Sequence, residues 1–422
     1  MELTDNTPIT VEHFEPAQKF LRIAVVTETW PPEVNGVAVT LSKLIHHLGQ
    51  RQHTIQLIRP RQDKDDAGIE NVGWSELLLR GLPIPRYPQL KLGLPSKKAL
   101  IKAWSTRRPD LVHIATEGPL SWSALQAAHT LRLPVTSDFR TNFHSYCQHY
   151  GIGWLSKPIV AYLRKFHNRT AFTMVPTQAM KYQLEDMGFR NLKVVARGVD
   201  TQLFHPNKRS DVMRDSWSVT PDTMVLLSVG RLAAEKNLDL TIQTYQKLKA
   251  AGRKVKMVFA GDGPMRTITE VKCPDAIFMG MCNHEQLATL YASADLLLFP
   301  SLTETFGNVT LESLSSGTPV LAFDCAAAGE FINENKNGWL IQSDEPHTYM
   351  QRALDITSDK VTLTQKREFS RNSVAHLSWH EIAGQVETIF HRAIELGETW
   401  RHNSKHSGAM PAISTVAKSS MM

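Results

Sequence analysis

The sequence predicts a protein of two doubly wound α/β domains, each built on a parallel β-sheet. Short apolar runs alternate with helical patterns along the chain, which is typical of parallel strands joined by crossover helices. The series of strands stops near residue 200 and starts again near residue 223. A length of 422 residues also suits two domains better than one.

The expected strands are near-continuous apolar runs, as is usual for strands that are buried on both faces of a sheet. In the first half of the chain these runs are residues 21–27, 54–59, 76–80, 110–114, 134–138, 171–175 and 192–196. In the second half they are residues 223–229, 255–260, 276–279, 295–299, 319–323 and 338–341.

The boundary between the two series is a polar stretch at residues 204–222, which contains Pro206 and Pro221 and is typical of a linker. We therefore expect a Rossmann-like N-terminal domain over residues 19–205 and a Rossmann-like C-terminal domain over residues 206–379. The polar ends, residues 1–18 and 402–422, show no periodicity and are expected to be disordered.

Composition restricts the partners of the chain. The 47 Lys and Arg residues against 41 Asp and Glu residues give a net charge of +6, which favours anions such as nucleotide diphosphates and acidic lipid headgroups. Nucleic acid is not expected, because no nucleic-acid motif or basic stripe with interleaved aromatic residues is present. The four cysteines lack the spacing of a zinc site or a disulfide framework.

The same sequence indicates a protein of the cytosol or of a cytosolic membrane surface. No apolar run approaches the roughly 20 residues that span a bilayer, and the start of the chain lacks a secretory pattern. Two basic and apolar stretches, residues 91–108 and 156–169, raise the hypothesis of peripheral attachment to an anionic membrane. Ordinary helices with a solvated cationic face explain them equally well.

The first candidate site follows the strand at residues 223–229. Gly230 permits close approach of the backbone, and Arg231 and Lys236 bring a guanidinium and an ammonium to the start of a helix. A diphosphate needs several such donors to meet its distributed charge. Taken alone, the pattern is equally consistent with two solvated cations in a loop.

The second candidate site follows the strand at residues 295–299. Gly307 and Asn308 open a short helix that ends at Ser316 and Gly317, and the N–H groups at its start are suited to phosphate. Glu304 lies just before this helix, and Glu312 shares the helical face of Asn308. Two acids so close to a phosphate site are best used to accept hydrogen bonds from sugar or ribose hydroxyls.

Five ordered segments together carry a family resemblance: RIAVVTETWPPEVNGVAVTLSKLIHHL, ARGVDTQLFHP, SVGRLAAEKNLDL, FAGDGPMR and the segment from Glu304 to Glu312. The chain resembles the family 4 retaining glycosyltransferases of GT-B architecture, in which two facing Rossmann-like domains enclose a central cleft. Within that family it is most similar to the branch that uses GDP-mannose and makes glycolipids. Sulfoquinovosyl- and glucosyl-diacylglycerol synthases are near relatives of that branch.

The resemblance implies roles for particular residues. Glu304 would contact the transferred sugar, Glu312 would contact the nucleotide ribose, and Arg231 and Lys236 would stabilise the departing diphosphate. A nucleotide sugar would be the co-substrate, and neither a metal nor another cofactor would be needed. The last helix, about 380–396, would cross back onto the acceptor-side N-terminal domain. The other implied contacts with the donor and the acceptor are Gly230, Gly261, Asp262, Gly263, Met281, Phe306, Gly307, Asn308, Asn35 and Gly36.

One position departs from the family pattern. Where relatives often carry a His-Thr pair after the fifth strand, this chain has Arg140 and Thr141. The histidine's role therefore does not transfer, and we interpret Arg140 and Thr141 as part of an acceptor or phosphate loop.

Several alternatives stay open at this point. A UDP-sugar donor of the glucosyl or sulfoquinovosyl type, or a non-catalytic nucleotide-sugar-binding protein, would suit the same motifs. Asp63 and Asp65 form an Asp-x-Asp pattern that could bind a metal, but they lie in a strongly charged stretch without apolar neighbours. A dehydrogenase is disfavoured, because the Gly-x-Gly-x-x-Gly pattern is missing from the strand-to-helix turns. The acceptor is expected to be a lipid or a glycan.

Overall fold

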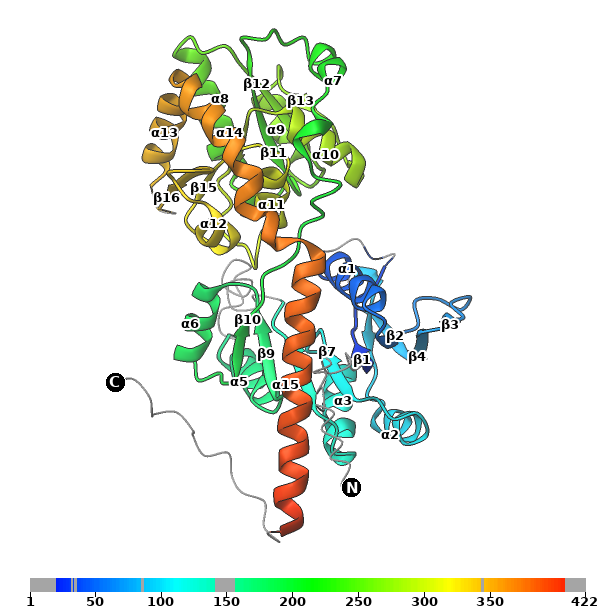
Figure 1. Ribbon diagram of the computed structural model, residues 1–422. Coiled ribbons are helices and arrows are strands. Elements are labelled where there is room, and N and C mark those ends of the chain that lie inside the picture. The colour runs from blue at the N-terminus through cyan, green and yellow to red at the C-terminus, as the bar shows by residue number, and fades with distance from the viewer. Residues whose placement is uncertain are drawn as a thin grey trace, which may run out of the picture.

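The computed structural model describes residues 20–31, 33, 36–84, 87–140, 156–342 and 345–406. These residues form two lobes, each with a parallel sheet between layers of helices, and a long helix, α15, runs along the N-terminal lobe (Figure 1). The predicted pair of doubly wound α/β domains is therefore confirmed.

The N-terminal lobe contains an eight-stranded sheet in the order β10-β9-β8-β7-β1-β2-β4-β3. All of its neighbouring strands are parallel except the short β3, which pairs antiparallel with β4. The strands are β1 (Arg22–Val26), β2 (Thr54–Pro60), β3 (Glu70–Asn71), β4 (Trp74–Leu79), β7 (Leu111–Ile114), β8 (Val135–Asp138), β9 (Phe172–Val175) and β10 (Leu192–Val194).

Helices cover both faces of this sheet. The apolar core on one face includes residues of α1 and α15, and the core on the other includes Trp104 of α2 and Phe166 of α5 together with α3. The helices are α1 (Gly36–Gln50), α2 (Lys97–Thr106), α3 (Pro119–Thr130), α5 (Ser156–His167) and α6 (Gln178–Asp186).

The C-terminal lobe contains a six-stranded parallel sheet in the order β13-β12-β11-β14-β15-β16. Its strands are β11 (Met224–Val229), β12 (Val255–Ala260), β13 (Ile277–Phe278), β14 (Leu296–Phe299), β15 (Val320–Phe323) and β16 (Gly338–Ile341). Its helices are α8 (Leu238–Ala250), α9 (Arg266–Lys272), α10 (His284–Ser293), α11 (Asn308–Ser315), α12 (Ala326–Phe331), α13 (Pro346–Ser358) and α14 (Lys360–Val374), with 3-10 turns η3 (Ala234–Lys236) and η4 (Ala375–Leu377).

Each predicted strand lies within two residues of an observed one at either end, but the sequence analysis missed β3 and a separate two-stranded hairpin. The hairpin pairs β5 (Gly81–Ile84) with β6 (Tyr87–Gly93), and Pro83 faces Lys91 across it. Proline and glycine weaken the apolar pattern that identifies a strand, which is why the sequence does not predict strands in this segment.

The stretch at residues 204–222 is not an extended linker. It forms η2 (Pro206–Lys208) and α7 (Asp211–Ser216) and packs on the C-terminal lobe. Arg214 is buried there and donates hydrogen bonds to Asp295 and to the Ser293 carbonyl, while Arg209 pairs with Asp295. The arginines that make this stretch look like a solvated linker are thus paired with the C-terminal lobe.

The final helix is longer than the sequence suggested. It runs over Trp379–His406 and is anchored on the N-terminal lobe by Glu387, whose carboxylate accepts a hydrogen bond from Arg51 and lies 3.2 Å from His53. The helical residues 402–406 fall within the tail that we expected to be disordered.

Two chain segments link the lobes and lie side by side. The Val199 N–H donates to the Leu377 carbonyl at 2.8 Å, and Val199 also forms a bridge with Ser378. Gly198 is required at this point, because a Cβ added there would lie 2.5 Å from the Trp379 ring.

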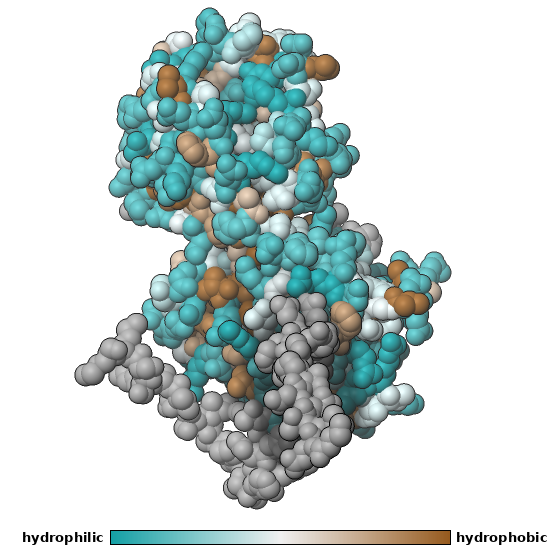
Figure 2. All heavy atoms as spheres, viewed as in Figure 1, coloured by the Kyte–Doolittle hydropathy of each residue, from teal (hydrophilic) through white to brown (hydrophobic). Residues whose placement is uncertain are grey.

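The visible face of the molecule is mainly hydrophilic. Figure 2 shows hydrophilic residues over most of this face, with apolar residues in small groups. Among the helices of the described residues, none is both long enough and apolar enough to cross a bilayer.

Candidate active site

The residues of the predicted phosphate site lie where β11 and β14 are neighbours in the C-terminal sheet. The strand order changes direction at this point, because β12 lies on the other side of β11. In open α/β sheets, ligands bind at such a point, beyond the carboxyl ends of the strands. The loops that carry Lys236 and Glu304 leave from these two ends, which explains why they meet.

Lys236 and Glu304 are in direct contact as an ion pair. The Ser301 hydroxyl donates to the same carboxylate at 2.8 Å, and the Lys236 ammonium lies 5.6 Å from the centre of the Phe299 ring. The two side chains are 21% and 13% exposed, so water screens the pair only in part. Lys236 is the last residue of the 3-10 turn η3, two residues before α8 begins, and does not lie inside the helix.

Glycines let two loops pack together beside this pair. Gly230 has φ +140°, and a Cβ there would lie 3.6 Å from Cε of Lys236. A Cβ on Gly261 would lie 1.9 Å from the Gly230 carbonyl oxygen, and one on Gly263 would lie 2.4 Å from the Leu232 carbonyl oxygen. The glycines of the GDGP segment therefore let the loop after β12 pack on the backbone of the loop after β11.

The short helix α11 begins beside Glu304, as the sequence predicted. Gly307 is its N-cap residue with φ +88°, and a Cβ on Gly307 would lie 3.6 Å from Cγ of Glu304. The helix spans Asn308–Ser315, and Ser316 and Gly317 end it. The N–H groups of its first turn are thus available beside the Lys236–Glu304 pair.

Glu312 is packed against α10. Its carboxylate accepts a hydrogen bond from the Tyr291 hydroxyl at 2.9 Å. Burial raises the pKa of Glu312 to about 7, although the bond from Tyr291 favours the charged form. Glu312 is therefore not a solvated helical residue.

The N-terminal lobe contributes Arg197, which follows β10 and reaches the start of α11. Its Nη1 donates to Asn308 Oδ1 at 3.4 Å, and its guanidinium lies 5.4 Å from the centre of the Phe306 ring. Gly36, the first residue of α1, lies close to Arg197, since a Cβ on Gly36 would be 3.9 Å from Nη1. We call the region formed by Lys236, Glu304, Gly307, Asn308, Arg197 and Gly36 the interlobe site.

Comparison with known proteins fits this arrangement. Residues 34–203 match the model described as "Glycosyltransferase Family 4", and residues 223–359 match "Glycosyl transferases group 1". A GDP-mannose-dependent alpha-mannosyltransferase of Corynebacterium glutamicum is 31% identical over 361 residues, which are 84% of this chain and 82% of that protein. The chain belongs to glycosyltransferase family 4.

Other relatives of this glycosyltransferase carry different names. Sulfoquinovosyl transferase of Arabidopsis thaliana is 28% identical over 88% of this chain and 74% of its own. Sucrose-phosphate synthase of Thermosynechococcus elongatus shares the fold, with a TM-score of 0.68 and 16% identity over 92% of this chain and all of that one. The family and the GT-B fold predicted from the sequence are confirmed, while the donor sugar differs among these names.

Several other predicted site residues make no hydrogen bond or ion pair with Lys236 or Glu304 in the structure, or lie outside the described residues. Arg231 follows Gly230, but its side chain is exposed. Met281 is 68% exposed in the turn before α10. Asp262 caps its own turn by accepting from the Gly263 N–H, and it also pairs with Arg266. Asn35 and Thr141 lie outside the described residues.

Arg140 is held by a carboxylate of its own lobe. Its Nε donates to Asp138 Oδ2 at 2.6 Å, and His113 lies 3.3 Å from the same oxygen. Burial alone would raise the pKa of Asp138, but Arg140 and His113 outweigh it and hold the pKa below its usual range. The positive charge of Arg140 is therefore largely compensated within the lobe.

Two residues that sequence reasoning left out have contacts at the site. Arg197 belongs to the ARGVDTQLFHP segment, which served only as a family signal, yet it follows the last strand of its lobe. Applying the strand-end rule to that strand would have selected it. Tyr291, the partner of Glu312, lies in the last turn of α10 and gave no sequence signal.

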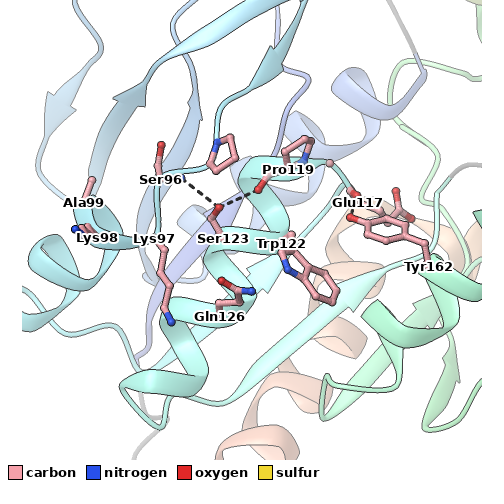
Figure 3. Close-up of a pocket in the computed structure, with 12 residues that line it drawn as sticks. Ser96, Lys97, Lys98, Ala99, Glu117, Pro119, Trp122, Ser123, Gln126 and Tyr162 are labelled. Atoms are coloured by element: carbon pink, nitrogen blue, oxygen red, sulfur yellow. Dashed lines mark hydrogen bonds between the residues drawn. The ribbon is translucent and has the colours of Figure 1, made fainter.

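A separate groove of about 940 Å³ lies on the N-terminal lobe between α2, α3 and α5 (Figure 3). Trp122 and Tyr162 form an aromatic wall, with ring centres 5.7 Å apart, and the Tyr162 hydroxyl donates to the Glu117 carbonyl. Lys97 and Lys98 line its α2 side. The two basic stretches noted in the sequence therefore meet at one groove.

Proposed function

We propose that this glycosyltransferase transfers mannose from GDP-mannose, with retention at the anomeric carbon, to a hydroxyl of a lipid acceptor. Diacylglycerol and a phosphatidyl-linked glycolipid are the proposed types of acceptor. The observation that carries the proposal is the Lys236–Glu304 pair beside the start of α11. The donor itself is suggested by the name of the relative with 31% identity.

The proposed chemistry follows from the charges of the site. Departure of the sugar develops negative charge on the diphosphate, and Lys236, Arg231 and the first N–H groups of α11 would stabilise that charge. Glu304 would hold hydroxyls of the sugar, and Glu312 would hold those of the ribose. Fixed cations and N–H dipoles supply this stabilisation without a metal, so we expect transfer to survive EDTA.

The assignment is tested by offering purified protein GDP-mannose, UDP-glucose and UDP-sulfoquinovose with diacylglycerol or phosphatidylinositol vesicles. Release of GDP that depends on the lipid is the expected result. Faster release of UDP from either UDP-sugar would replace the donor assignment with the alternative. Release that no lipid stimulates, but a soluble glycan does, would overturn the lipid acceptor.

The groove supports a membrane-bound acceptor, and we propose that it faces an anionic bilayer. Lys97 and Lys98 lie on its α2 side, and the ammonium of Lys165 lies 6.0 Å from the Trp122 ring. Each basic side chain at an anionic surface contributes about 1 kcal/mol. The protein would then act as a peripheral enzyme on the cytosolic face of the inner membrane.

Replacing Lys97 and Lys98 together by alanine is expected to weaken binding to phosphatidylglycerol vesicles about 30-fold, which corresponds to about 2 kcal/mol. Co-flotation with vesicles at low salt measures this. The matched control is Lys254→Ala with Lys336→Ala, since both lysines are exposed on the C-terminal lobe. Equal flotation of both double variants would contradict the proposed orientation.

The raised pKa of Glu312 leads us to expect that donor binding depends on pH. Its pKa of about 7 means that the carboxyl is largely protonated below pH 7, whereas ribose hydroxyls donate best to the ionised form. Affinity for GDP is therefore expected to rise by up to about tenfold per pH unit below pH 7 and to level off above it. Calorimetry between pH 5.5 and 8 measures this.

The variant Glu312→Gln is expected to bind GDP with an affinity that hardly changes with pH. The exposed Glu368→Gln, on α14 of the same lobe, is the control and should keep the wild-type profile. Stability should move in the opposite direction to affinity. Because the folded pKa is raised from 4.5, the carboxyl favours the folded state at low pH, and this contribution is lost as pH rises through 7.

A further inference from the structure

Arg197 reaches from the N-terminal lobe to the start of α11, beside the proposed diphosphate site. Its Nη1 reaches Asn308, the first residue of α11, its guanidinium lies over the Phe306 ring, and a Cβ on Gly36 would lie 3.9 Å from the same Nη1. Asn308 and Phe306 belong to the loop and helix that carry Glu304 and Gly307. The guanidinium thus lies between the two lobes, next to the opening of the helix.

The charge of Arg197 has no carboxylate partner in the described part of the chain, where no acidic oxygen lies within 4.0 Å of it. The nearby acids are already engaged, since Asp138 binds Arg140 and Glu304 binds Lys236. Burial, followed by repulsion from Arg140, lowers the pKa of Arg197 to about 10, so the side chain is still cationic at neutral pH. A partly buried cation without a counterion is costly unless an anion binds beside it.

We propose that Arg197 binds the diphosphate of the nucleotide sugar from the N-terminal lobe, opposite Lys236 and the start of α11. This inference rests on the proposed function. The planar guanidinium presents paired donors that match two phosphate oxygens, whereas its present acceptor is one amide oxygen at 3.4 Å. The diphosphate would replace or share that contact.

A diphosphate that is bound by residues of both lobes would also affect how close the two lobes are. Arg197 and Lys236 belong to different lobes, and a diphosphate bound by both favours the arrangement in which the lobes are close. Arg197 would also stabilise the charge that develops on the leaving diphosphate. Arg197 is therefore expected to support donor affinity and the rate of transfer together, and to leave the KM for the lipid unchanged.

The test compares nucleotide diphosphates with monophosphates. Calorimetry with GDP and GMP, and with UDP and UMP, is performed on wild type, Arg197→Ala and Arg197→Lys. A charge-assisted hydrogen bond is worth enough to predict that Arg197→Ala binds the preferred diphosphate about 10- to 100-fold more weakly, with less than about a twofold effect on the monophosphate. Arg197→Lys should recover part of the loss, because it restores the charge but not the paired donors.

The control is Arg190→Ala. Arg190 is exposed just before β10 and Arg197 follows the same strand, so the Arg190→Ala variant should bind diphosphate as wild type does. Thermal unfolding of each variant shows whether it is folded. If Arg197→Ala does not fold, Arg197→Lys decides, with an expected loss of about 3- to 10-fold for the diphosphate alone.

Unchanged diphosphate affinity in a folded Arg197→Ala or Arg197→Lys variant would overturn the inference. A raised KM for the lipid with normal diphosphate binding would do the same, and would assign Arg197 to an anionic group of the acceptor instead. Failure of the proposed function looks different. In that case wild type itself would bind neither GDP nor UDP and would release neither from a nucleotide sugar.

Discussion

Replacing Lys236 by alanine is expected to lower kcat for transfer by about 100- to 1000-fold, the usual cost of removing one preorganised donor to developing charge. The proposed role of this ammonium is to meet the leaving diphosphate, and it is in direct contact with the Glu304 carboxylate beside the start of α11. The substitution also leaves Glu304, which is 13% exposed, without its cation. Initial rates of nucleotide release at saturating donor and acceptor give the effect.

Two further variants distinguish loss of the Lys236 charge from a general effect on the enzyme. Lys254→Ala removes an exposed lysine of the same lobe and should keep the wild-type rate. Lys236→Arg retains a cation and should lose less activity than Lys236→Ala. A Lys236→Ala enzyme within threefold of wild type would show that the diphosphate is stabilised elsewhere, and the proposed site would have to be abandoned.

Gly261→Ala is expected to lower the free energy of unfolding by about 3 kcal/mol or more, from backbone strain and overpacking together. Gly261 has φ +131°, which other residues rarely adopt, and an added Cβ would lie 1.9 Å from the Gly230 carbonyl oxygen. The clash is with backbone, so a change of rotamer cannot relieve it. Since Gly230 lies beside Lys236, donor binding should weaken as well.

Gly252→Ala is the matched control for Gly261→Ala. Gly252 also has a positive φ, +75°, but an added Cβ would meet nothing within 4 Å. It should therefore show the strain alone, about 1 kcal/mol. Urea unfolding of both variants, followed by fluorescence, measures the difference. Equal destabilisation of the two would mean that the loops after β11 and β12 are not packed as tightly as the structure shows.

The sheets were predictable because their strands are buried on both faces, so that residues 224–229 or 338–341 are apolar at nearly every position. The stretch at residues 204–222 was misread for the opposite reason. Its charged residues suggest solvent, but Arg209 and Arg214 are satisfied by Asp295, about 80 residues away in the chain. Composition within a window contains no information about such a distant partner.

Some residues of the candidate site were predictable from the sequence and others were not. Lys236, Glu304 and Gly307 were predictable because each follows a strand of one sheet, and parallel strands end at a common edge. The contacts of Arg197 and Arg140 were not predictable, since their partners are Asn308 of the other lobe and Asp138, which is held at the end of β8. Spacing along the chain identifies the residues that lie at one edge of a sheet, but it does not identify the residues of the other lobe that contact them.

The paired crossing between the lobes limits how they can move. A single flexible linking segment would let one lobe rotate in any direction. Two linking segments that are hydrogen-bonded at Val199 and Leu377 resist torsion and leave rotation about one axis. Opening for product release would then follow one repeatable path. Cutting the backbone in either strand alone would leave the halves tethered, with a joint free to twist.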